Sequence, residues 1–303
     1  MAYAMIRSNT HLAEALEEYN AKVHECEEKG TEEQRLNAYI MRGTILSMME
    51  SYISALTDFD DAVEIISSIE SKGTRVDPGS FIKAHVSRGE LQYADGAVGM
   101  ADDYAVAAER LTELNENSRY FDRKKIIKMC IECCEDLLDE GYPNNVRPFF
   151  EKVEMMLFDK IDPWSENRYV EALNFMGQAE QDLNEFGNSL EYLDKSVKIC
   201  QELMKKDALE DEMAFVFALM LRGDVGVFNE DFESGLRDFE AAISVLEVML
   251  AYHRPETKEL LIQTHRDVSD LLIKMGEDSE AEKHMLRMLE LDVSDGLNEF
   301  DDV

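Results

Sequence analysis

The 303-residue sequence is poor in basic side chains, proline and glycine. It has 31 lysine and arginine residues against 65 acidic ones, a formal net charge of −34. Binding to nucleic acid needs a basic surface that displaces counterions, and docking on an anionic membrane needs clustered Lys and Arg. The composition therefore argues against both kinds of partner. With only 5 prolines and 15 glycines, long uninterrupted elements are expected.

Long hydrophobic runs and secretion signals are missing as well. No stretch approaches the roughly 18 consecutive apolar residues of a membrane span. The start, MAYAMIRSNT, has no basic region followed by an apolar run. The five cysteines are an odd number without a secreted-type framework, which fits a reducing cytoplasm. We therefore expect a cytoplasmic protein, and its 45% of apolar residues can form a large core.

Catalytic and metal-binding motifs are also absent from the sequence. It contains no GxSxG, HExxH, Walker phosphate loop or GxGxxG. Cys130, Cys133 and Cys134 share a helical face in CIECC, but a zinc site normally needs a second ligand pair at a set spacing. We interpret Cys133 as a small packing residue, and we predict no catalytic residue, no metal and no cofactor.

One short string recurs along the chain. Its copies are ALTDFDDAV (55–63), MADDYAVAA (100–108), NVRPFFEKV (145–153), SLEYLDKSV (189–197), GLRDFEAAI (235–243) and AEKHMLRML (281–289), with a further copy, ALEEYNAKV, at 15–23. A marker residue precedes each of the six: Gly43, Gly89, Cys133, Gly177, Gly223 and Ser269. The markers are 44 or 46 residues apart, and each stands twelve residues before its string, or eleven in the second unit. A fixed offset inside a fixed period indicates a true repeat.

Both halves of each unit have helical spacing, as Val170, Leu173 and Met176 illustrate. Each unit is therefore predicted to be a pair of helices of about 18 residues each. A small marker residue lets the second helix approach, and a ring between two small residues fills the remaining gap. The predicted packing residues of this kind are Gly43, Ala55, Phe59, Ala62, Gly89, Tyr104, Gly177, Ser189, Gly223, Gly235, Phe239 and Ala242.

Proline and aspartate predict where some first helices begin. Pro78, Pro163 and Pro255 stand where three first helices should start, because a missing N–H is harmless there. Asp77 and Asp162 precede two of these prolines as candidate N-caps.

The pattern resembles the tetratricopeptide repeat, which has a glycine, a small residue twelve positions on, an aromatic residue sixteen on and a small residue nineteen on. The units that begin at Gly43 and Gly223 match it in full. The period is longer than the usual 34 or so residues, the closing proline is absent, and an arginine precedes the marker glycine in three units. HEAT-type repeats have a matching length, but without a fixed helix-kinking proline they are the second choice.

The resemblance implies an all-α fold, a right-handed α-α superhelix of long helix hairpins. We expect a single domain at 1–292, with a half repeat at 9–30 and six repeats over about 33–292. The acidic tail at 293–303 is expected to be disordered.

The resemblance also implies a function, because the first helices of such proteins line a concave groove that binds a peptide or a helix. Carried over by position, the partner-binding residues are Ile40, Thr44, Met48, Val86, Tyr93, Asn174, Gln178, Phe217, Met220, Asp224, Val227 and Phe228. We therefore expect a non-catalytic scaffold or adaptor that binds a protein or peptide segment. A regulatory sensor that responds to a ligand or peptide is the alternative, and an enzyme is a distant third. The apolar members near Phe217 could instead be buried in the stack.

Charge suggests two further hypotheses. Arg42, Arg88 and Arg222 occur in the units that carry Asp58, Asp103 and Asp238 before the ring, which predicts Arg–Asp pairs between the two helices of a unit, with a substrate-binding arginine row as the alternative. The acidic excess is interpreted as a solvated face; it could also select a basic partner or reflect adaptation to high salt.

Overall fold

The computed structural model describes the backbone of residues 2–94, 99–158, 162–252 and 257–298, and the side chains of residues 11–292 within those ranges. These residues form thirteen α-helices and two short 3₁₀ helices, and none of them is in a β-strand. The helices fall into two compact units, Met1–Lys152 and Val153–Val303. The all-α fold predicted from the sequence is confirmed. The single-domain boundaries stay a prediction.

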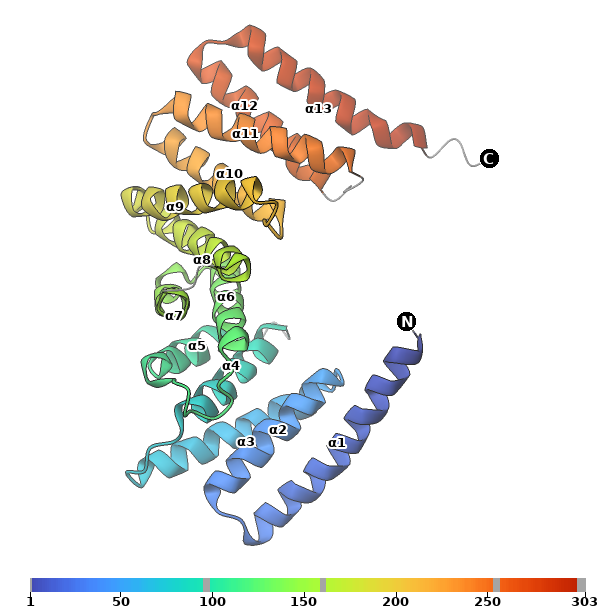
Figure 1. Cartoon of the computed structure of the whole chain (residues 1–303), viewed down its shortest axis with the longest axis vertical. Helices are drawn as coiled ribbons and strands as arrows, with labels where there is room; N and C mark the ends of the chain where they lie inside the picture. Colours follow the sequence, from blue (N-terminus) through green and yellow to red (C-terminus); the bar gives the residue numbers. More distant parts are fainter. Residues whose placement is uncertain (1, 95–98, 159–161, 253–256, 299–303) are drawn as a thin grey trace. The chain divides into compact units, whose positions relative to one another are not determined.

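The first unit contains six complete helices, among which the second packs on the third and the fourth on the fifth as antiparallel pairs (Figure 1). Their bounds are α1 (Ala2–Lys29), α2 (Glu32–Met48), α3 (Tyr52–Ser71), α4 (Pro78–Ala94), α5 (Met100–Ala108) and α6 (Arg123–Asp139), with 3₁₀ turns at Leu111–Glu113 and Pro143–Asn145. α7 (Arg147–Leu157) contains the boundary between the two units. In this unit α2 packs against α1, α3 and α4.

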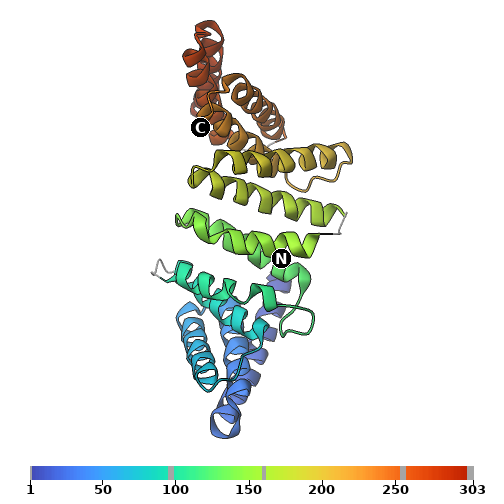
Figure 2. The same ribbon diagram turned by 90° about the vertical axis from the view of Figure 1, so that its left-hand side faces the viewer.

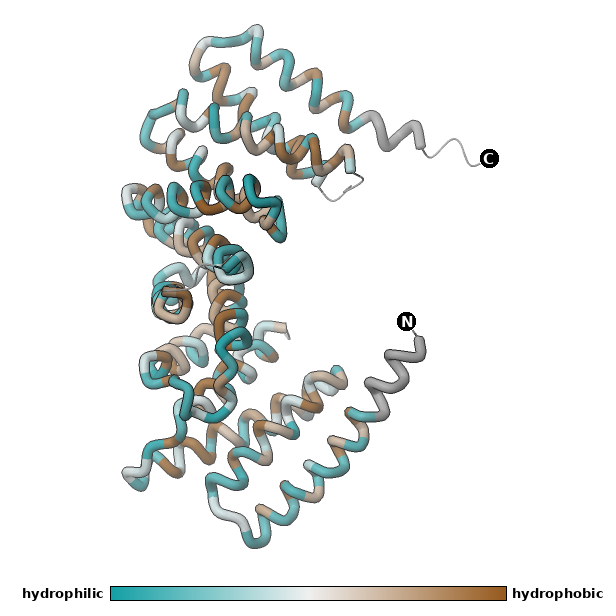
Figure 3. The backbone as a smooth tube through the Cα atoms, viewed as in Figure 1, coloured by the Kyte–Doolittle hydropathy of each residue, from teal (hydrophilic) through white to brown (hydrophobic). Residues whose placement is uncertain are grey.

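The second unit repeats the same hairpin. Its helices are α8 (Pro163–Asp182), α9 (Phe186–Lys205), α10 (Glu212–Phe228), α11 (Phe232–Ala251), α12 (Lys258–Met275) and α13 (Asp278–Asn298). Each helix packs against the next one along the chain, and the view turned by 90° shows the same neighbours (Figure 2). Brown and teal segments alternate along these helices, as expected of amphipathic elements (Figure 3).

Capping side chains explain where several first helices begin. Asp77 accepts a hydrogen bond from the Ser80 N–H at 2.9 Å, and Asp162 accepts one from the Ser165 N–H at 3.1 Å, so both predicted caps form. Pro78 and Pro163 are the first residues of α4 and α8, as expected, whereas Pro255 lies outside the described residues.

The marker glycines have equivalent surroundings in four units. A Cβ added at Gly43, Gly89, Gly177 or Gly223 would lie 2.6–3.1 Å from the side chain at the ring position of the same unit. For Gly223 the nearest atom is Cε1 of Phe239, at 2.8 Å. Such close approach of the two helices is possible only without a side chain at the marker. This close approach is the geometry that the repeat pattern predicts at these positions.

Cys133 takes the marker position in the third unit and is buried together with Cys130 and Cys134. Burial raises the pKa of the Cys130 thiol to about 12 and the pKa values of the other two thiols well above their usual range. These thiols stay protonated near neutral pH and pack as small apolar groups.

Three segments differ from the expected pattern. α5 and α7 are far shorter than the predicted 18 residues, with 9 and 11 residues. After α5 the chain forms the 3₁₀ helix Leu111–Glu113 and then a polar turn, in which Asn115 Oδ1 accepts a hydrogen bond from the Asn117 N–H and the Asn115 N–H donates to Ser118 Oγ. At the other end, α13 continues to Asn298, so 293–298 is helical rather than disordered; each added helical residue contributes one more backbone hydrogen bond. The remainder of the predicted tail lies outside the described residues.

Candidate binding groove

The first helices of the N-terminal unit line an open groove of about 660 Å³. α2 contributes Met41, Thr44 and Met48 to this groove. The floor is formed by apolar residues of α4 and α6 with the loop before α6: Ile82, Val86, Leu114, Phe121, Ile126 and Met129. Met48 is 65% exposed, so it is free to contact a ligand. Three methionines in one groove provide flexible, polarisable side chains that adapt to different apolar partners.

Three of the binding residues predicted from the sequence line this groove in the structure, namely Thr44, Met48 and Val86. Ile40 was assigned wrongly, because it is fully buried in a core cluster with Leu36, Ile66 and Phe81 and presents no surface to a partner. Tyr93 is half-buried beyond the groove, and burial together with Asp139 and Asp136 raises its pKa.

In the second unit, Asn174 was also assigned wrongly. Its amide donates a hydrogen bond to the Ala214 carbonyl at 2.8 Å and accepts one from Ser196 Oγ at 2.6 Å. Ile40 and Asn174 occupy the same place, three residues before the marker. Ile40 belongs to the same core cluster as Phe81 of the following first helix, and Asn174 donates a hydrogen bond to the Ala214 carbonyl of its own following first helix. Gln178, one residue after its marker, is half-buried.

The predicted aromatic cluster on α10 does not form one patch. Met220 and Val227 pack against core clusters, so for them the interpretation of burial in the stack is the correct one. Phe217 is 48% exposed, and Phe228 stacks on Phe186 with ring centroids 4.9 Å apart. Asp224 is at the surface, where partial burial and the neighbouring Asp267 raise its pKa to about 6.

The groove does not share the acidic excess of the chain. Its lining carries four basic side chains, Lys83, Arg119, Lys125 and Lys128, and three acidic ones, Glu90, Asp122 and Glu132. Asp122 caps α6 by accepting hydrogen bonds from the backbone of Lys124 and Lys125. Burial raises the pKa of Glu90, and Glu132 raises it further, whereas Lys83 opposes the shift. A groove with both signs of charge gives no support to a purely basic partner.

The loop at 115–122 forms one wall of the groove, and the repeat pattern did not predict it. Arg119 donates to Glu33 Oε1 at 3.2 Å, and the Tyr120 hydroxyl donates to Asn37 Oδ1 at 3.1 Å, which ties the loop to α2. The Arg119 N–H also donates to Asp77. A Cβ on Gly79 would lie 1.6 Å from the Arg119 carbonyl oxygen, so only glycine allows the loop to cross the start of α4. We call this loop the strap.

All three predicted Arg–Asp pairs form in a two-pronged geometry. Arg42 donates to Asp58 at 2.8 and 2.6 Å, Arg88 to Asp103 at 2.7 and 2.7 Å, and Arg222 to Asp238 at 2.8 and 2.6 Å. Each arginine also reaches back to the second helix of the preceding pair. Its partners there are Asn20, Asp60 and Asp194. One arginine therefore joins three helices. The contact of the arginine with the preceding helix could have been found in the sequence, because an aspartate stands 28 residues before Arg88 (Asp60) and before Arg222 (Asp194).

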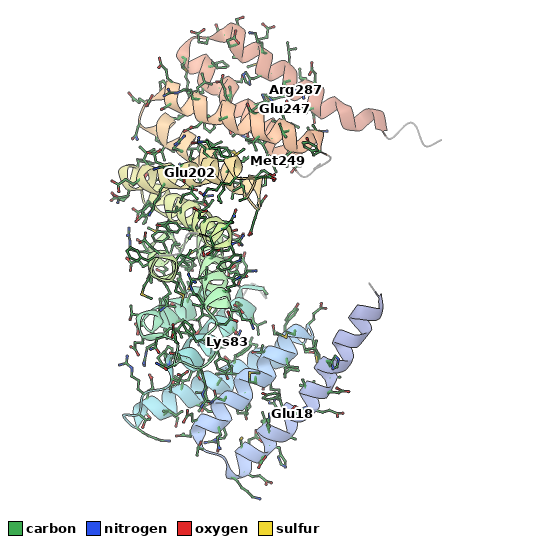
Figure 4. All side chains as sticks on the ribbon, in the orientation of Figure 1. Glu18, Lys83, Glu202, Glu247, Met249 and Arg287 are labelled. Carbon is green, nitrogen blue, oxygen red and sulfur yellow. The ribbon has the colours of Figure 1, made fainter. Side chains whose placement is uncertain are left out.

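The last helix pair replaces the arginine with a different network. Arg287 on α13 donates to both oxygens of Glu247 on α11 at 2.9 Å, and the two side chains lie together in Figure 4. His265 and His284 face each other with their Nδ1 atoms 2.9 Å apart. Burial is the main cause that lowers the pKa of each ring, so the pair favours the neutral form.

Comparisons with known proteins identify the fold. No family model matches the chain, and no curated protein matches it in sequence. BtubC (BKLC) from P. vanneervenii superimposes with a TM-score of 0.55 and 14% identity over 94% of this chain and 92% of that one. Aspartyl phosphate phosphatase F from Bacillus subtilis gives 0.56 and 12% over 97% and 73%. A STAND signal-transduction ATPase with a tetratricopeptide repeat sensor from Pyrococcus horikoshii gives 0.52 and 12% over 89% and 38%.

The chain has a tetratricopeptide-repeat-like fold. At 12–14% identity the comparisons show this fold alone, and one of the three structures is named as a phosphatase, so the tetratricopeptide-repeat-like fold by itself does not decide between binding and catalysis. Among the described side chains, no group of three or more His, Cys, Asp or Glu residues is placed to hold a metal ion. No helix in the described ranges is long and apolar enough to cross a membrane.

Proposed function

We propose that this protein is a non-catalytic scaffold or adaptor that binds a peptide or helical segment of another protein in the groove of α2, α4 and α6. The observation that supports this most strongly is the groove itself, an open surface of about 660 Å³ whose floor is apolar and whose three methionines come from two helices. Apolar floors with adaptable side chains suit segments that bind in extended or helical form.

The partner-binding residues of this proposal are Met48 and Thr44, with Met41 and Met129 added from the structure. Val86 lines the floor of the groove but is 1% exposed, so no direct contact is assigned to it. Phe217 stays a proposed contact in the second unit because of its 48% exposure. Gln178, Asp224, Tyr93 and Phe228 stay proposals carried over by position. The roles of the Arg–Asp pairs and of the marker glycines are proposed to be structural.

The experiment is a selection of displayed random peptides on the immobilised protein, repeated with a Met48→Asp, Met129→Asp variant. We expect the variant to bind the selected peptides at least about tenfold more weakly, because a charge in an apolar contact costs more than a kilocalorie per mole. The matched control is Met155→Asp, Met204→Asp, which changes two methionines of 57% and 45% exposure outside the groove. Equal binding by the wild type and the groove variant would contradict the proposal.

A further inference from the structure

Four of the seven charged side chains in the groove follow one order along two helices, whereas Asp122 caps α6 and Arg119 bonds to Glu33. α4 carries Lys83 and, seven residues on, Glu90, and α6 carries Lys125 and, seven residues on, Glu132. Seven residues are about two helical turns, so each lysine is about 10 Å from the glutamate of its own helix. Lys83 is labelled on α4 in Figure 4.

The two lysines lie at the same end of the groove, and the two glutamates lie at the other. The strap, which leads into α6, crosses α4 at Gly79, so both helices begin on that side. Glu90 and Glu132 line the same groove; Glu132 raises the pKa of Glu90, and Lys83 lowers it. We call Lys83 and Lys125 the basic end and Glu90 and Glu132 the acidic end. The positive ends of the two helix dipoles add to the basic end.

These four charges form no close ion pair among the described side chains, although Lys83 acts on Glu90 electrostatically from its own helix. Within the described residues, neither lysine and neither glutamate is in a salt bridge, although the chain forms many elsewhere. Lys128, which also lines the groove between the two ends, forms no such ion pair in the described ranges either. Charges beside an apolar floor that stay unpaired within the fold are available to a ligand, and pairing them desolvates both partners together.

We infer that the groove selects its ligand by the order of the ligand's charges. It binds a peptide segment whose acidic side chains lie at the basic end and whose basic side chains lie at the acidic end, with apolar side chains between them. This inference rests on the proposed function. The acidic and basic groups of the ligand are then about 10 Å apart, which corresponds to about three residues in an extended segment or about seven in a helix. The groove therefore fixes the direction of the bound segment as well as its composition.

The test uses one peptide obtained by the selection above and a second peptide in which every Asp or Glu is exchanged for Lys and every Lys or Arg for Glu. Binding of both is measured by fluorescence anisotropy at low salt. The wild type should prefer the selected peptide about tenfold, because several weak ion pairs change from attraction to repulsion. Raising the salt concentration should reduce this preference.

The decisive variant exchanges the two ends: Lys83→Glu, Glu90→Lys, Lys125→Glu and Glu132→Lys. It leaves the net charge unchanged and should prefer the charge-exchanged peptide. The matched control is Lys198→Glu, Glu202→Lys on α9, an exposed pair of the same residue types that should leave the preference unaltered.

The possible outcomes separate the inference from the proposed function. If selected peptides need Met48 and Met129 but bind equally well with exchanged charges, the inference is overturned and the proposed function stands. If the exchanged-end variant keeps the wild-type preference, the inference is likewise overturned. If no peptide distinguishes the wild type from the methionine variant, the proposed function itself fails.

Discussion

The Arg222–Asp238 pair offers the most detailed test of how the helix pairs are held together. The Asp238 side chain is 13% exposed and receives both of its hydrogen bonds from Arg222. Replacing Arg222 with Met removes them and leaves a carboxylate with little access to water. We expect this change to lower the free energy of unfolding by about 3 kcal/mol.

Replacing Asp238 instead of Arg222 should lower the free energy of unfolding by a smaller amount. Asp238→Leu leaves the guanidinium of Arg222 with 23% exposure and with Asp194, which it contacts at 2.8 Å. We expect a loss of about 1–2 kcal/mol for this variant. Asp194→Ala should cost about 0.5 kcal/mol, because the Asp194 carboxylate is 65% exposed and surface pairs contribute little.

The double variant Arg222→Met, Asp238→Leu replaces the pair with apolar side chains of similar size. Its stability should return to within about 1 kcal/mol of the wild type, since no buried charge is left unpaired. Urea unfolding followed by circular dichroism measures all four variants, and the slope of the transition should stay constant. A double variant no more stable than Arg222→Met would refute the reasoning.

Three further predictions concern packing, pH and thiol reactivity. Gly223→Ala should destabilise the protein by about 1–3 kcal/mol, because the new Cβ would lie 2.8 Å from the Phe239 ring. Gly187→Ala on α9, where a Cβ would meet no atom, should be neutral or stabilise the protein by up to about 1 kcal/mol. Urea unfolding measures both variants, and equal effects would contradict the close packing at Gly223. The lowered pKa values of His265 and His284 mean that the folded state favours the neutral rings, so their contribution to the free energy of unfolding is present above about pH 6.5 and is lost as the pH falls further. The difference in stability between pH 8 and pH 5.5 should therefore be smaller in a His265→Gln, His284→Gln variant than in the wild type. An unchanged difference would argue against this pair as the cause. Four of the 5 cysteines are buried with raised pKa values and should resist iodoacetamide in the folded protein, namely Cys130, Cys133, Cys134 and Cys200. Cys26 is half-buried and should react. Rapid labelling of all five without denaturant, measured by mass spectrometry, would contradict the packing role.

The helix pairs could be predicted from the sequence because one packing rule recurs in it. A residue without a side chain at Gly43, Gly89, Gly177 or Gly223 meets a large side chain in the second helix of the same unit, and the fixed offset between them records this contact. The Arg–Asp pairs were visible for the same reason. Both are contacts within one unit, so both partners recur at a constant separation.

The binding surface was harder to predict because it depends on contacts between units. Ile40 and Asn174 were placed in the groove by analogy with a shorter repeat, yet this position contacts the next first helix. The strap also escaped prediction. The strap takes the place of the end of a helix without changing the length of the repeat, so the spacing between markers gives no sign of it. The one indication of the strap in the sequence was a run of polar turn residues at 115–118.

Hydrogen exchange of the protein with and without a selected peptide tests the central functional claim most directly. If the groove of α2, α4 and α6 is the binding surface, bound peptide should slow exchange in residues 41–48, 79–90 and 119–132. Protection confined to α3, α5 or the second unit, with these three segments unchanged, would contradict the account.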